Sequence, residues 1–122
     1  MDRKRSLVFF KDYFNEFFEA QKEKVKEKID YVLFLVATVE RIPKKFFSDI
    51  EGEPGLFEIR IEYESNIYRI FCCFDEGNLI ILMNGFQKKT QKTPKQEIEK
   101  AKRIMKEYFY LKGDKNEIKK QS

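Results

Sequence analysis

Alternating apolar and polar positions predict a group of strands in the middle of the chain. Residues 56–63 alternate cleanly, so one face is apolar and the other is charged. Residues 67–74 are apolar on both faces except at Arg69, which is typical of a central strand, and residues 79–86 are almost entirely apolar. The connections are too short for crossover helices, so we expect an antiparallel meander.

The spacing of apolar residues before this meander predicts helices. Residues 6–10 are short and apolar and predict a first strand, whereas residues 11–41 show a helical period. The polar stretch 21–24 favours a break into a helical hairpin, with one long helix as the alternative. Pro43 is expected to end this region, because proline disfavours helical backbone at the preceding residue, and a loop is expected over 44–55.

A last helix is predicted after the meander. Thr93 is expected to cap it, Pro94 to occupy its first position, and Gly113 to end it. The predicted fold class is therefore α+β, in the order β-α-α-β-β-β-α, with an antiparallel sheet and helices packed on one face. We expect a single domain over residues 1–112 and a flexible C-terminal tail over 113–122.

The register of the first hairpin in the meander decides where two arginines point. A two-residue turn at 65–66 would place Arg69 opposite Glu62 and leave Arg60 on the same sheet face. A slip by one residue would bury Arg69 among apolar side chains, which costs several kcal/mol, so we favour the first register. The shared face then holds either an ordinary surface ion pair between Glu62 and Arg69 or two cations placed to bind a phosphate.

The composition excludes several classes of site. The chain of 122 residues contains no histidine and two cysteines, Cys72 and Cys73, which are adjacent. Histidine-based metal sites, Ser-His-Asp triads and cysteine-rich zinc sites are therefore excluded, and both cysteines are expected to be structural, in a reducing cytoplasm. No apolar run is long enough for a membrane helix or a signal peptide.

The charge is distributed unevenly along the chain. Residues 1–84 hold 13 basic and 16 acidic side chains, a balance of −3, whereas residues 85–122 hold 12 basic and 5 acidic side chains, a balance of +7. A positive segment suggests an anionic partner, nucleic acid first, although a solvated lysine-rich surface remains the alternative.

Four short motifs together resemble a known toxin family. They are Gly-Leu-Phe-Glu-Ile-Arg at 55–60, Ile-Tyr-Arg-Ile-Phe at 67–71, Gly-Phe-Gln-Lys-Lys-Thr at 85–90, and Thr-Pro at 93–94 before a basic helix. Their order and spacing over about residues 7–110 are similar to the HigB-like branch of the RelE/ParE toxin superfamily. The resemblance implies a cytoplasmic toxin of a type II toxin–antitoxin module, inhibited by an antitoxin that usually carries a helix-turn-helix domain.

The resemblance also implies an activity and a set of site residues. RelE-like members are ribosome-dependent mRNA endoribonucleases, so we expect metal-independent cleavage by the RNA 2′-hydroxyl, without a cofactor. We expect Arg60 and Arg69 to contact the phosphate oxygens, and Lys88 to be a second phosphate contact or the acid for the leaving oxygen. Glu62 is the candidate base unless Arg69 simply neutralises it. The expected RNA-backbone anchors are Lys44, Lys45, Lys89, Lys92 and Lys95. A ParE-like inhibitor of DNA gyrase and a non-catalytic RNA- or protein-binding module are the alternatives.

Overall fold

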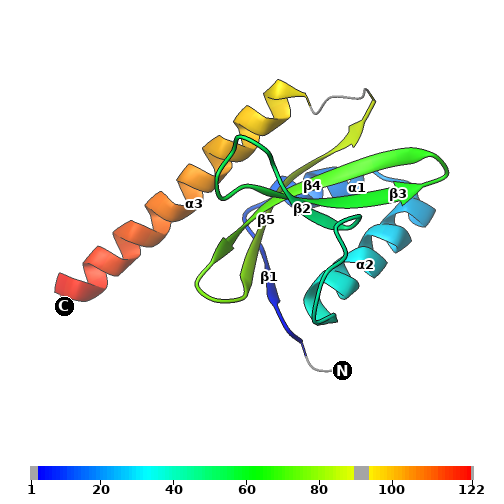
Figure 1. Cartoon of the computed structure of the whole chain (residues 1–122). Coiled ribbons are helices and arrows are strands. Elements are labelled where there is room, and N and C mark those ends of the chain that lie inside the picture. Colours follow the sequence, from blue (N-terminus) through cyan, green and yellow to red (C-terminus); the bar gives the residue numbers. More distant parts are fainter. Residues whose placement is uncertain (1–2, 90–93, 122) are drawn as a thin grey trace.

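The computed structural model describes residues 3–89 and 94–121, with side chains as far as residue 113 (Figure 1). The strands are β1 (Ser6–Phe9), β2 (Phe47–Asp49), β3 (Phe57–Tyr63), β4 (Asn66–Asp75) and β5 (Leu79–Lys88). The helices are α1 (Tyr13–Glu19), α2 (Glu23–Thr38) and α3 (Lys95–Gln121). The predicted α+β class is confirmed. No helix in these ranges combines the length and the apolar character that a bilayer span requires.

The strands form one five-stranded open sheet in the order β1-β5-β4-β3-β2. The antiparallel meander β3-β4-β5 is confirmed. An entirely antiparallel sheet was the wrong expectation, because β1 pairs with β5 in parallel. The predicted loop over 44–55 also contains the short strand β2, which pairs with the first three residues of β3 and leaves the rest of that edge open.

Helices cover both faces of the sheet, so the prediction of helices on one face is wrong (Figure 1). Helices α1 and α2 pack on the face that carries Ile59, Ile70 and Leu82. Helix α3 crosses the opposite face, where a second core forms. Its buried members are Leu56, Phe71, Cys73, Ile81, Met83, Ala101 and Ile104. A central strand with two apolar faces needs cover on both sides, and α3 provides the second cover.

The helix boundaries follow the predicted pattern in part. The break at residues 21–24 is confirmed, since α1 ends at Glu19 and α2 begins at Glu23. Helix α2 ends at Thr38, earlier than the 11–41 pattern implied, because Val39 adopts extended backbone (φ −74°, ψ 147°). Gly113 does not end α3, which continues to Gln121. The division into a domain over 1–112 and a flexible tail over 113–122 stays a prediction, and the expected Thr93 cap lies outside the described residues.

The hairpin between β3 and β4 turns one residue earlier than predicted. Glu64 and Ser65 form the turn, with positive φ angles of 46° and 68°, the combination that a type I′ hairpin requires. Arg60 therefore lies directly opposite Arg69, and Glu62 lies opposite Ile67, so the predicted Glu62–Arg69 pairing is wrong. The change in register is two residues, however, so both arginines still share one face, as predicted.

Polar contacts at the end of β4 and the start of α1 hold α3 in place. The Tyr108 hydroxyl donates a hydrogen bond of 2.6 Å to Asp75, and Lys112 approaches the same carboxylate at 2.7 Å. Glu107 accepts hydrogen bonds from Lys11 and Tyr13, each at 2.9 Å. Helix α3 is thus fixed across the sheet by charged contacts as well as by its apolar stripe.

Candidate functional site

The part of the sheet face that α3 leaves uncovered carries the predicted cationic residues. Arg60 on β3 and Arg69 on β4 are direct cross-strand partners, and Phe86 on β5 lies opposite Arg69 on the other side. Lys88 lies opposite Ile67, two residues further along the same face. The structure therefore brings three of the predicted site residues, Arg60, Arg69 and Lys88, to one surface, which we call the arginine face.

A register irregularity in the sheet places Lys88 on this surface. Cys72 pairs with Leu82, whereas Ile70 pairs with Gly85, so one extra residue of β5 is inserted between the two pairs. Without that insertion Gln87, and not Lys88, would lie on the face of Arg69. Such bulges commonly redirect a side chain next to a functional site.

Glu58 is the residue of this site that the sequence analysis did not identify. Its carboxylate forms an ion pair with the Arg69 guanidinium, and the two side chains are only 13% and 11% exposed. One nitrogen of Arg69, Nε, is buried and has no hydrogen-bond partner among the residues that the structure describes. Alternation along β3 already places Glu58 on the face of Arg60, but only the observed register shows that it reaches Arg69.

Arg60 is more accessible than Arg69. Its side chain is 38% exposed, and its contact with Glu62 is a loose ion pair of 3.7 Å between Nη2 and Oε2. The Glu62 side chain is 63% exposed, so this pair is weak and Arg60 can exchange it for another anion. One arginine of the pair is therefore held rigidly, and the other is available to a ligand.

Lys88 lies in a positive environment that changes its acidity. Burial lowers the pKa of its ammonium group below the usual 10.5, and the charges of Arg69 and Arg60 lower it further, against the opposing effect of Glu58. A lysine with a lowered pKa gives up its proton more readily than an ordinary surface lysine. The arrangement can therefore bind a phosphate and also supply a proton to it.

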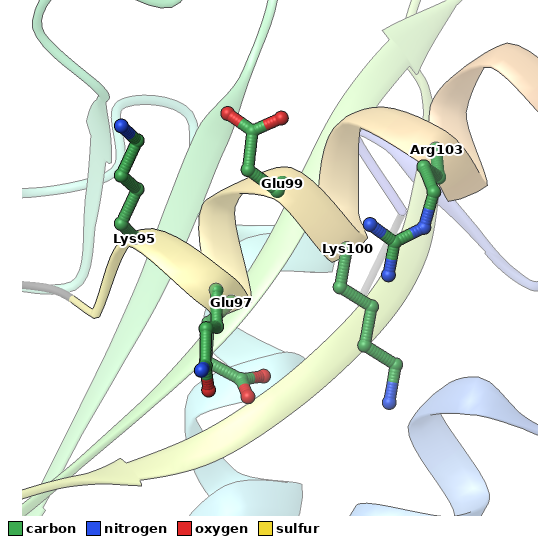
Figure 2. Close-up of a pocket in the computed structure, with 6 residues that line it drawn as sticks. Lys95, Glu97, Glu99, Lys100 and Arg103 are labelled. Carbon is green, nitrogen blue, oxygen red and sulfur yellow. The ribbon is translucent and has the colours of Figure 1, made fainter.

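The predicted RNA anchors are more scattered. Lys44 and Lys45 are exposed in the turn before β2, Lys89 is exposed at the end of β5, and Lys92 lies outside the described residues. Lys95 begins α3 and lines a hollow of about 520 Å³ along that helix, together with Lys100 and Arg103. Figure 2 shows Lys95 pointing away from Lys100 and Arg103, and Glu97 and Glu99 are interspersed among them. The hollow on α3 is thus mixed in charge and distinct from the arginine face.

The two cysteines are buried on opposite faces of β4. Burial raises the pKa of the Cys73 thiol to about 11 and holds the pKa of Cys72 well above its usual value. Both groups therefore remain neutral thiols packed in the two cores, which fits the structural role expected for them.

Comparison with known protein families identifies the chain. The family described as phage-derived protein Gp49-like (DUF891) matches residues 16–106, which include α2, the whole meander and the first part of α3. A comparison with curated proteins found no significant match. The chain belongs to the Gp49-like phage-derived protein family, a RelE/ParE-like family of toxins from toxin–antitoxin systems.

Proposed function

We propose that this chain is a HigB-like toxin that cleaves messenger RNA in translating ribosomes. The observation that carries the proposal is the convergence of Arg60, Arg69 and Lys88 on one sheet face. The toxin family supports the general role, and the arginine face supplies cations suited to a phosphodiester. A cytoplasmic location, a RelE-like topology and a cognate antitoxin, expected to carry a helix-turn-helix domain, are parts of the same proposal.

The proposed reaction uses the nucleophile that RNA itself provides. The 2′-oxygen attacks the adjacent phosphorus, the bond from phosphorus to the 5′-oxygen breaks, and the products are a 2′,3′-cyclic phosphate and a 5′-hydroxyl. The negative charge that develops on the phosphate would be stabilised by the guanidinium groups of Arg60 and Arg69. Glu58 orients Arg69, so that less reorganisation is required when the substrate arrives.

Lys88 is the proposed acid in this reaction. Its lowered pKa favours transfer of a proton to the departing 5′-oxygen, which would otherwise leave as an alkoxide. Glu62 is exposed and near Arg60, and its role as the base that accepts the 2′-hydroxyl proton stays a prediction. An exposed carboxylate is a weak base at neutral pH, so positioning by the ribosome would supply much of the rate.

The test compares the two known targets of this superfamily. Purified, antitoxin-free protein is added to a reconstituted translation reaction and, separately, to a DNA gyrase supercoiling reaction. We expect translation to stop, with new RNA fragments that carry 5′-hydroxyl ends and therefore need kinase treatment before ligation, while supercoiling continues. Blocked supercoiling with intact mRNA would instead assign the chain to the gyrase inhibitors. Intact mRNA and normal supercoiling would leave only a binding role.

A further inference from the structure

A cationic hollow lies at the open edge of the sheet, next to the arginine face. It has a volume of about 350 Å³. Its lining residues are Lys28 from α2, Lys45 and Phe46 from the turn before β2, and Arg60 and Glu62 from β3. We call this set the edge hollow. It exists because β2 pairs with β3 only as far as Ile59 and leaves the remaining edge of β3 uncovered.

The wall of the edge hollow is fixed by backbone hydrogen bonds. The amide of Arg60 donates to the carbonyl of Phe46 at 2.8 Å, and the amide of Phe46 donates to the carbonyl of Pro43 at 2.9 Å. These contacts tie the turn that carries Lys45 and Phe46 to the strand that carries Arg60. Together with Lys28 of α2, these two segments form the hollow, which is therefore built from three separate parts of the chain and not from one exposed loop.

The charges of the edge hollow favour an anion. Three cations line it and face a single carboxylate, that of Glu62, which contacts Arg60 at 3.7 Å. Among the residues that the structure describes, no ion pair joins Lys28 or Lys45 to an acidic group. The Lys28 ammonium lies over the Tyr31 ring, 5.4 Å from its centroid, a contact that leaves its charge free to attract an anion. Two unpaired ammonium groups beside a hollow are suited to phosphate oxygens.

An aromatic ring accompanies these cations. Phe46 is half-buried, and the Lys45 ammonium lies 4.9 Å from its ring centroid. An aromatic side chain in a positive groove is the usual platform on which proteins stack single-stranded bases. Because Arg60 lines both surfaces, the edge hollow continues directly from the arginine face.

We propose that the edge hollow binds a nucleotide of single-stranded RNA that flanks the cleaved bond. The Lys45 ammonium leaves the Phe46 ring and joins Lys28 at the adjacent phosphate, and the base stacks on the ring face that this movement exposes. This inference rests on the proposed function and extends it, because it adds a substrate subsite outside the arginine face. It also gives Arg60 a second role, as the link between the two phosphates.

The test measures how salt affects the binding of fluorescein-labelled octauridylate to the full chain. Removing one cation that binds a phosphate of a single strand lowers the slope of log affinity against log salt by about 0.7, so Lys28→Ala should lower it by that amount. Phe46→Leu should weaken binding by at least about fivefold at every salt concentration and leave the slope unchanged, whereas Phe46→Tyr should retain affinity. Thermal unfolding checks that each variant is folded.

Matched controls come from α2. Lys24→Ala removes a lysine that is 73% exposed and paired with Glu27, and Phe34→Leu removes an aromatic ring that is 53% exposed. Neither residue lines the edge hollow, so both controls should bind RNA like the wild-type chain. Lys28→Ala removes no side chain of the apolar core. The test therefore remains informative if Phe46→Leu is unstable.

Each outcome decides the proposal. Lys28 and Phe46 variants that behave like their controls would overturn the subsite, and so would a wild-type chain without affinity for the RNA. If the Lys28 and Phe46 variants bind RNA normally but are inhibited less by the antitoxin, the subsite is overturned, and the edge hollow binds an acidic peptide of the antitoxin instead. Ribosomal cleavage is measured in parallel: its absence, with RNA binding that still depends on the edge hollow, would overturn the proposed function separately.

Discussion

Replacing Glu58 by glutamine should destabilise the protein far more than the same change at Glu62. Both residues lie on the same face of β3, and both contact an arginine. Glu58 is 13% exposed and Arg69 is 11% exposed, whereas Glu62 and Arg60 are 63% and 38% exposed. The two substitutions make the same change, from a carboxylate to an amide, and therefore compare a buried ion pair with a solvated one.

The magnitudes follow from the two environments. Removing one partner of a fully buried ion pair costs about 3–5 kcal/mol, because the other charge remains without compensation. Arg69 retains some exposure and water reaches it in part, so we expect about 2–3 kcal/mol for Glu58→Gln. An exposed pair contributes at most about 1 kcal/mol, and at a separation of 3.7 Å we expect less than about 0.5 kcal/mol for Glu62→Gln.

Urea unfolding at pH 7 measures both values. With a typical slope of about 1–3 kcal/mol per molar urea, the midpoint for Glu58→Gln should fall by about 0.7–3 M. The double variant Glu58→Leu with Arg69→Met should recover most of this loss, because apolar residues of similar volume replace a buried pair at little cost. Equal small effects of the two glutamine variants would refute the view that Arg69 is held by Glu58.

Three further changes test the packing of the two helical layers by urea unfolding. Gly85→Ala should cost about 1–3 kcal/mol, since its new Cβ would lie 2.5 Å from the Phe17 ring; a loss below about 0.5 kcal/mol would contradict this close approach. Gly113→Ala has open space around it and should instead stabilise α3, by up to about 1 kcal/mol. Burial raises the pKa of Asp75, but the hydrogen bonds from α3 outweigh it and lower the pKa below its usual value. The stabilising contribution of the Asp75 carboxylate is therefore present above about pH 4 and is lost as the pH falls through its folded-state pKa. Asp75→Asn should lower the free energy of unfolding by about 1–2 kcal/mol at pH 7, and this difference from wild type should disappear in acid. A difference that does not change with pH would contradict the role of the Asp75 carboxylate in holding α3.

The sequence was sufficient for those parts of the fold that depend on local patterns. The period of apolar residues located α2, and the polar stretch at 21–24 marked the break before it. Strict alternation assigned Arg60 and Arg69 to one face, and that assignment survived an error of two residues in register because the strand period is two. The parts of the site that rest on alternation alone were therefore predictable.

Other features depend on choices that local patterns do not encode. Glu64 and Ser65 form the turn with positive φ angles, although neither is a glycine. The residue types that usually occupy such turns favoured residues 65–66 instead, and the predicted turn was therefore placed one residue too late. The irregularity that brings Lys88 to the arginine face lies in β5, between Leu82 and Gly85. Gly85 is a local signal for a bulge, but it does not show how the residues beyond it pair with β4. The contact between Glu58 and Arg69 follows only from the corrected register.

The position of α3 could have been inferred and was not. Phe71 and Cys73 on β4, with Ile81 and Met83 on β5, form a second apolar face that requires cover. That pattern excludes helices on a single face. By contrast, the edge hollow combines Lys28 with residues from β3 through tertiary packing, which no spacing along the chain reveals.

The most direct test of the arginine face is primer extension on a defined mRNA with programmed ribosomes. Wild-type protein, the double variant Arg60→Ala with Arg69→Ala, and the control Arg103→Ala on α3 are compared after each is shown to be folded. We predict new 5′-ends that require ribosomes, that persist with the control and that disappear with the double variant. Cleavage by the folded double variant at the wild-type rate would contradict the account.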